Sequence, residues 1–104
     1  MKTGRSTALV CIAEFTPKPG MTDQLIETLS QLIPLTKKES GCVRYELHQG
    51  VDDKNLITFI DRFADRAAFD HHCNTDYINK YFYDILPGLT DNIKITLYNE
   101  LIFH

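Results

Sequence analysis

The sequence contains no tryptophan, and its three cysteines are widely spaced. Cys11, Cys42 and Cys73 are odd in number and form no Cys-x-x-Cys pair. We therefore expect reduced thiols in a cytoplasmic protein, and not a disulfide framework. Long hydrophobic runs are also missing, because none approaches the roughly 20 residues that cross a bilayer. The apolar stretch 8–13 ends at Glu14, too early for a signal peptide, so we predict no membrane partner.

The sequence also lacks a strong excess of charge of either sign. Eleven Lys and Arg residues are scattered among 14 Asp and Glu residues, for a net charge of −3. Without a basic patch, we predict no nucleic-acid partner. The sequence also lacks a P-loop, a dinucleotide fingerprint and a nucleophile elbow, which excludes the enzyme classes that depend on them.

The composition and length fit one ordinary globular domain. Apolar residues make up 43% of the chain and charged residues 24%, as in folded proteins. A chain of 104 residues suits a single domain. We predict that residues 1–6 form a flexible extension and that residues 7–104 form this domain.

The first half of the chain reads as a strand followed by a helix. Residues 7–16 suit a pleated strand, which ends at a Pro-Lys-Pro-Gly run. Apolar residues recur at helical spacing over 23–39, with Thr22 as the predicted N-cap. Pro34 should kink this helix, and Gly41 should end it in a left-handed conformation.

The second half of the chain begins with a predicted hairpin. Residues 42–48 and 56–63 alternate as two strands joined by a short turn. Asp65 is a good N-cap for a short helix, a second helical segment follows over 76–86, and residues 93–103 alternate as a last strand. The order β-α-β-β-α-β predicts a ferredoxin-like α+β fold, a four-stranded antiparallel sheet with both helical regions on one face.

The central strands are apolar on both sides, although the helices can cover only one. In the strand 56–63, Leu56 and Ile60 lie opposite Ile57, Phe59 and Phe63. Soluble monomers rarely expose a large apolar patch. We therefore predict a homodimer through the helix-free sheet face; the alternative is a monomer that exposes this face.

Several short motifs follow one another along the chain. They are Lys18-Pro19-Gly20, Pro34, the run Lys38-Glu39-Ser40-Gly41-Cys42 into Tyr45-Glu46-Leu47, the strand FIDRF, and Ala68-Phe69-Asp70-His71-His72 followed by Thr75. In this order and spacing, the sequence resembles the antibiotic-biosynthesis monooxygenase family of dimeric α+β barrel proteins over about residues 7–103. The resemblance implies oxygenation of aromatic polyketides or quinols by molecular oxygen, with no metal, flavin or other cofactor.

The chain also departs from that family. Members often carry Glu-x-Trp where this chain has Asp61-Arg62-Phe63, and a second His where Thr75 is followed by Asp76. Heme-degrading relatives need a histidine on the last helical segment, and residues 77–86 contain none, so we expect no heme. Other relatives include an isomerase of a phosphorylated sugar and many small proteins of unknown role.

Two residues are candidates for proton transfer. His72 follows Phe69 by three residues on one helical face, so it should point towards the sheet with a pKa near neutrality. Its alternative role is that of a core-edge histidine bonded to a backbone carbonyl. Asp61 shares a strand face with Phe59 and Phe63, where burial would raise its pKa. A salt bridge to a helix cation is the alternative.

A pocket for a flat aromatic substrate is predicted between sheet and helices. We expect its wall to include Tyr45, Phe59, Phe63, Phe69, Tyr77, Tyr81 and Phe82, with Asn55 bonding a substrate oxygen. These aromatic residues could equally be plain core, and Asn55 could serve its turn. No metal site is predicted, because the neighbouring His71 and His72 diverge on a helix.

Three functions fit these residues. The first is a cofactor-independent oxygenase in which His72 or Asp61 takes a proton from an aromatic substrate. The second is a proton-transfer isomerase of a small phosphorylated carbonyl compound, with Arg44 or Arg62 at the pocket mouth. The third is a non-catalytic binding or stress-response dimer.

Overall fold

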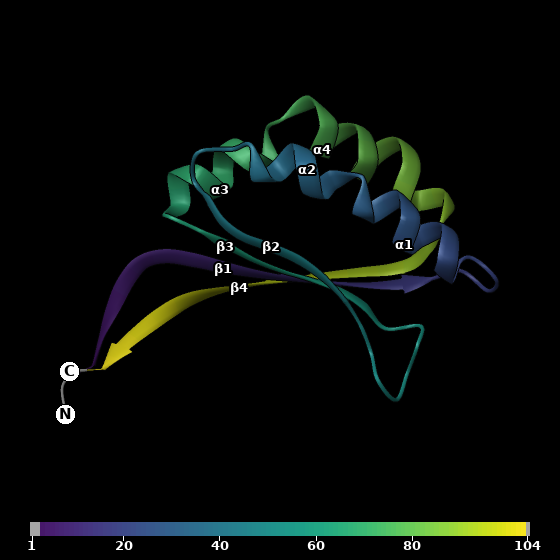
Figure 1. Cartoon of the computed structure of the whole chain (residues 1–104), viewed down its shortest axis with the longest axis horizontal. Helices are drawn as coiled ribbons and strands as arrows, with labels where there is room; N and C mark the ends of the chain where they lie inside the picture. The colour runs from purple at the N-terminus through teal and green to yellow at the C-terminus, as the bar shows by residue number, and fades with distance from the viewer. Residues whose placement is uncertain (1–2, 104) are drawn as a thin grey trace.

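The computed structural model describes residues 3–103, which fold into one antiparallel sheet with all helices on one face (Figure 1). The sheet has the order β2-β3-β1-β4. Its strands are β1 (Thr3–Pro17), β2 (Cys42–Gln49), β3 (Ile57–Phe63) and β4 (Thr90–Phe103). The helices are α1 (Thr22–Ser30), α2 (Leu32–Lys37), α3 (Arg66–Cys73) and α4 (Asp76–Lys80), followed by the π-helical turn η1 (Tyr81–Ile85) and the 3-10 turn η2 (Leu86–Gly88). The predicted α+β order and sheet are confirmed.

Strand β1 begins earlier than predicted. It starts at Thr3, not at residue 7, and Thr3 pairs with Phe103 of β4. Residues 3–6 therefore belong to the sheet, which corrects the predicted extension over 1–6; residues 1–2 lie outside the described part. The paired ends of β1 and β4 project as an arm beyond the helices (Figure 1).

The helix predicted over 23–39 is two helices, α1 and α2, which meet at Gln31. Pro34 explains the break. Its missing N–H cannot bond the carbonyl of Ser30, and its ring crowds that same carbonyl. Helix α2 nevertheless continues past Pro34 to Lys37.

Gly41 does not have the predicted left-handed conformation. Among the described glycines only Gly20 has a positive φ, of 79°. Gly41 is instead needed for close contact, because a Cβ there would lie 2.3 Å from the Cβ of Ala68. This glycine brings the α2–β2 loop directly against α3.

The core lies between the sheet and the helices. Alternate residues of β1 and β3 are buried on this side, as the sequence alternation predicts. Phe15 and Phe59 meet edge to face with ring centroids 6.2 Å apart. Side chains that are almost wholly buried include Phe15, Phe59, Phe63, Leu25, Leu29, Leu32 and Ile57. The core fixes the sheet and helices around a space that it does not entirely fill.

The helix-free face of the sheet is an apolar centre flanked by ion pairs. Val10, Ile12 and Ile60 alternate with the buried residues of their strands and are half-buried. Arg62 forms a two-point ion pair with Glu100, with Nη2 2.9 Å from Oε1. Arg44 of β2 forms a single-contact ion pair with Glu46 through Nε. Tyr98 of β4 is half exposed.

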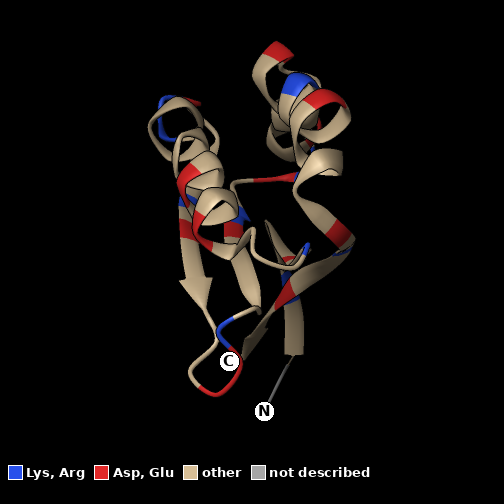
Figure 2. Cartoon of the chain, turned by 90° about the vertical axis from the view of Figure 1, so that its right-hand side faces the viewer, with Lys and Arg blue, Asp and Glu red and all other residues tan. Residues whose placement is uncertain are grey.

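Lys and Arg residues are interspersed with Asp and Glu residues along the helices and the β2–β3 turn (Figure 2). Within residues 3–103, no helix combines the length and the apolar character required to traverse a bilayer.

Candidate functional site

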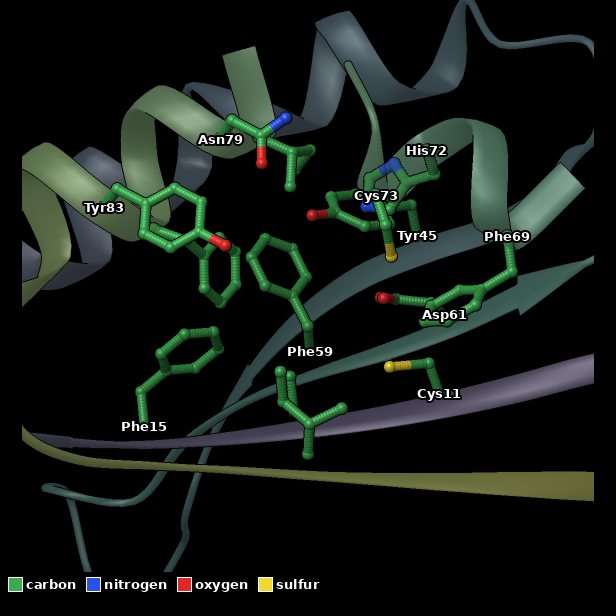
Figure 3. Close-up of a pocket in the computed structure, with 14 residues that line it drawn as sticks. Cys11, Phe15, Tyr45, Phe59, Asp61, Phe69, His72, Cys73, Asn79 and Tyr83 are labelled. Atoms are coloured by element: carbon green, nitrogen blue, oxygen red, sulfur yellow. The ribbon is translucent and has the colours of Figure 1, made fainter. Parts of the chain in front are cut away.

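A cavity of about 200 Å³ lies between the sheet and the α3–η1 segment. Figure 3 shows its wall, which is built from all four strands and from α3, α4 and η1. Five predicted site residues line it, namely Tyr45, Phe59, Asp61, Phe69 and His72, together with Phe82. The structure therefore brings both candidate proton-transfer residues into one cavity.

Four predicted pocket residues do not line this cavity. Phe63 is buried behind Phe69 and His72, with ring centroids 5.5 Å and 4.9 Å away. Tyr77 donates its hydroxyl hydrogen to a carboxylate oxygen of Glu39. The hydroxyl of Tyr81 donates to Gln31 Oε1 at 2.7 Å.

Asn55 is the fourth, and it is exposed next to the β2–β3 turn. Its backbone N–H donates to Asp53 Oδ1 at 2.9 Å, and its Oδ1 accepts a hydrogen bond of 2.7 Å from the Thr22 hydroxyl. Asn55 thus ties the turn to the start of α1. Thr22 is the first residue of that helix, whose N-cap is Met21 and not the predicted Thr22.

The remaining wall residues were not predicted. They are Cys11, Ala13, Phe15, Cys73, Ile78, Asn79, Tyr83 and Ile95. The three from β1 share the buried face of the alternating strand, so their pattern could have revealed them. Tyr83 could not be found in this way, because the π-helical turn η1 changes which side chains share a face.

His72 is held from behind by a buried carboxylate. It is 5% exposed, and its Nδ1 lies 2.9 Å from Glu39 Oε2. The hydroxyl of Tyr77 donates to the same Glu39 oxygen. Because Nδ1 is engaged, Nε2 is the ring nitrogen left for a ligand. The partner of His72 is thus a glutamate side chain and not a backbone carbonyl.

Burial and hydrogen bonding have opposite effects on this histidine. Burial lowers the pKa of His72 below its usual range, and the hydrogen bond and charge of Glu39 oppose part of that change. Burial and the Glu39 carboxylate raise the pKa of Tyr77 to about 12. At neutral pH the imidazole is therefore uncharged, with Nε2 free to accept a proton.

Glu39 was not predicted from the sequence as a site residue. It lies in a polar run between α2 and β2, where local pattern predicts a solvated side chain, yet its side chain is only 7% exposed. Its partner His72 is 33 residues further along the chain. Only the tertiary packing of the loop on α3 reveals the contact.

Asp61 is buried, and none of residues 3–103 forms a salt bridge with it. It is 4% exposed, and its Oδ1 has no hydrogen-bond partner among residues 3–103. Burial raises the pKa of Asp61 to about 8, although a hydrogen bond with the Cys11 thiol lowers it in part. The carboxyl group points into the cavity between the sulfurs of Cys11 and Cys73 (Figure 3). This is a carboxylic acid kept protonated by its apolar surroundings.

In the described part of the chain, no three His, Cys, Asp or Glu side chains converge as the ligands of a metal ion would. The two buried polar side chains that line the cavity, His72 and Asp61, are the candidates for proton transfer and hydrogen bonding.

Known proteins resemble this chain in fold and in sequence. The sequence model of the antibiotic biosynthesis monooxygenase family matches residues 8–82. The Mycobacterium tuberculosis protein named "Putative monooxygenase Rv0793" is 28% identical over 92 residues, which cover 88% of this chain and 90% of that protein. The crystal structure of SO0527 from Shewanella oneidensis matches with a TM-score of 0.94 and 39% identity, over 98% of this chain and 100% of that one. PA3566 from Pseudomonas aeruginosa matches with a TM-score of 0.83 and 32% identity, over 93% and 97%. The chain therefore belongs to the antibiotic biosynthesis monooxygenase family.

Proposed function

We propose that this protein is a cofactor-independent monooxygenase that oxidises a small phenol or quinol, with His72 as the general base. The observation that carries the proposal is the buried Glu39–His72 pair beside an aromatic cavity. The family match supports monooxygenase chemistry in general, and the cavity supports an aromatic substrate.

The first step is removal of a phenolic proton. Nε2 of His72 accepts it, and the Glu39 carboxylate at Nδ1 stabilises the imidazolium that forms. General-base catalysis of this kind contributes about 10²- to 10⁴-fold in rate. The proton then resides on His72, and the substrate has become an electron-rich phenolate.

The phenolate supplies all the electrons for the second step. It passes an electron to molecular oxygen, and recombination forms a carbon–oxygen bond at a ring carbon that carries hydrogen. His72 returns its proton to the terminal oxygen of this peroxide. Loss of the ring hydrogen as a proton and cleavage of the oxygen–oxygen bond then give a quinone and hydroxide, and the hydroxide combines with that proton as one water. The stoichiometry is one phenol and one O₂ to one quinone and one water. The walls formed by Phe15, Phe59 and Phe82 keep bulk water from the reacting atoms.

Oxygen uptake with a panel of small substituted phenols and quinols tests the proposal. We expect His72→Gln to lower turnover by about 10²-fold or more. The matched control is His71→Gln, since His71 is exposed on the same helix and should leave turnover unchanged. Full turnover by His72→Gln would refute the assignment of the base. No uptake with any member of the panel would favour the non-catalytic binding dimer.

The isomerase alternative is not favoured by the positions of the cations. Arg44 and Arg62 were expected at the pocket mouth, but both lie on the opposite face of the sheet. They are engaged there with Glu46 and Glu100. A phosphorylated substrate in the cavity would meet neither guanidinium group.

The proposed active form is a homodimer. The apolar centre of the helix-free face, formed by Val10, Ile12 and Ile60, is the surface that a second copy would cover. The flanking ion pair of Arg62 and Glu100 would lie at its rim. We also propose a cytoplasmic location, on the ground that all three cysteines are free thiols.

A further inference from the structure

Two buried titratable side chains, Asp61 and His72, line the cavity. We propose that Asp61 is not a second base but a neutral hydrogen-bond donor, which binds the carbonyl or phenol oxygen of an uncharged single-ring ligand, and that the cavity rejects the corresponding anions. The inference rests on the proposed function in one respect, since it names the substrate class of the same cavity.

The first support is an unfilled hydrogen-bonding position. Asp61 lies in the middle of β3, is more than nine-tenths buried, and directs its carboxyl group into the cavity (Figure 3). Its Oδ1 finds no partner among the described residues. A buried polar atom without a partner has lost its hydrogen bonds to water and gained none in return. A ligand oxygen that forms a hydrogen bond with the carboxyl group recovers part of this free-energy cost.

The second support is the charge of the surroundings. The titratable groups that face Asp61 are Cys11 from β1, Cys42 and Tyr45 from β2, and His72 and Cys73 from α3, with Tyr83 of η1 also in the wall. Burial raises the pKa of Cys11 to about 12 and that of Cys42 to about 11, so both thiols are neutral.

No cation compensates a charged ligand. Within residues 3–103, the cavity wall includes no Lys or Arg. An anionic ligand would give up its hydration without a counter-charge, which costs far more than burying a neutral ring. The wall is otherwise aromatic and aliphatic, which suits an uncharged ring.

The third support is the division of roles between Asp61 and His72. Burial raises the pKa of Asp61 to about 8 and lowers that of His72, so at neutral pH the carboxyl group holds its proton and the imidazole lacks one. Two groups whose pKa values are pushed apart in this way serve as donor and base. Asp61 can then stabilise the ligand oxygen on which negative charge develops.

The size of the cavity limits the ligand. An engineered apolar cavity of about 150 Å³ holds one benzene molecule. A cavity of about 200 Å³ therefore suits one substituted ring more closely than a fused polycyclic system.

Binding of two nearly isosteric probes tests the inference, with no turnover needed. Acetophenone has a carbonyl acceptor and stays neutral at every pH used, whereas benzoate is an anion. Calorimetric titration or ligand-observed NMR at pH 6.5 should give at least tenfold tighter binding of acetophenone. Asp61→Leu should weaken acetophenone binding by about tenfold, because the donor is gone. Asp61→Asn, whose amide can donate, should stay within about threefold of the wild type.

The pH series is the sharper measurement. Raising the pH to 9.5 removes the Asp61 proton, so acetophenone should bind the wild type about tenfold more weakly, while Asp61→Asn should not change. Asp91→Asn removes an exposed carboxylate from β4 and should behave as the wild type.

Three results would overturn the inference: benzoate binding as tightly as acetophenone, no binding of acetophenone to the wild type, or the same pH response in the wild type and Asp61→Asn. The first and third need no change in quinol turnover, so the inference can fail while the proposed oxygenase stands. Conversely, the expected selectivity without oxygen uptake would support the ligand class and refute the oxygenase. The wild-type measurements alone decide the matter if Asp61→Leu does not fold.

Discussion

Replacing Asp61 with asparagine should make the free energy of unfolding depend less on pH. Burial raises the pKa of Asp61 from 3.8 to about 8 in the folded chain. Between these values the folded state keeps a proton that the unfolded state releases. The free energy of unfolding of the wild type therefore falls as pH rises from about 4 to about 8 and is then constant with respect to this group.

The slope follows from one proton, at about 1.4 kcal/mol per pH unit. Between pH 5 and pH 8, the wild type should lose about 4 kcal/mol relative to Asp61→Asn, which has no proton to lose. This is a large part of the roughly 5–15 kcal/mol by which domains are stable. In urea, the difference between the two midpoints should widen by roughly 2 M over this range.

Urea unfolding at pH 5, 6.5 and 8, followed by circular dichroism at one protein concentration, measures this difference. Asp91→Asn controls for the loss of one negative charge, because Asp91 is exposed. Its midpoint should follow that of the wild type. If the midpoints of the wild type and Asp61→Asn differ by the same amount at all three pH values, Asp61 is not held protonated, and the cavity does not contain a neutral carboxylic acid.

Three further predictions concern other parts of the molecule. Glu39→Gln should lower quinol turnover and move the acidic limb of its pH profile to lower pH, because the carboxylate that raises the pKa of His72 is gone; an unmoved profile in a folded variant would show that Glu39 has no electrostatic role. Gly41→Ala should cost about 1–3 kcal/mol in urea unfolding, since its Cβ would meet that of Ala68 at 2.3 Å, and an unchanged midpoint would contradict this. Sedimentation should give a particle of twice 12.0 kDa for the wild type and one of 12.0 kDa for Ile60→Asp, whereas a wild-type monomer at micromolar concentration would refute the dimer.

The strands were predictable because their side chains obey a local rule. Alternation in β1 and β3 identifies the face that carries Phe15, Phe59 and Asp61, and it places Asp61 among apolar neighbours. The inward direction of His72 follows from its spacing to Phe69 on α3. In both cases the repeat of the side chains, every two residues in a strand and about every 3.6 in a helix, determines which side chains are buried and where they point.

Other features depend on groups far apart in the sequence. Glu39 becomes a partner of His72 only when the α2–β2 loop packs on α3. The two residues are 33 positions apart, so no local sequence pattern predicts their contact. The break at Gln31 and the exclusion of Tyr81 from the cavity depend on helix hydrogen bonding, which Pro34 and the π-helical turn η1 alter. Apolar residues of a helical segment can be counted from sequence, but such irregular turns decide which of them reach the cavity.

The contact between Gly41 and Ala68 has a consequence for redesign of this scaffold. The loop that carries Glu39 is fastened to the α3 side by this contact and by the 2.8 Å hydrogen bond from the Ala64 N–H to the Gly41 carbonyl. A protein engineer seeking new ligands would vary a wall position such as Tyr83, which is 77% exposed and lies outside the buried core. Gly41 does not line the cavity, yet it is the position least open to change, because any added carbon atom there would shift the loop that carries Glu39, the hydrogen-bond partner of His72.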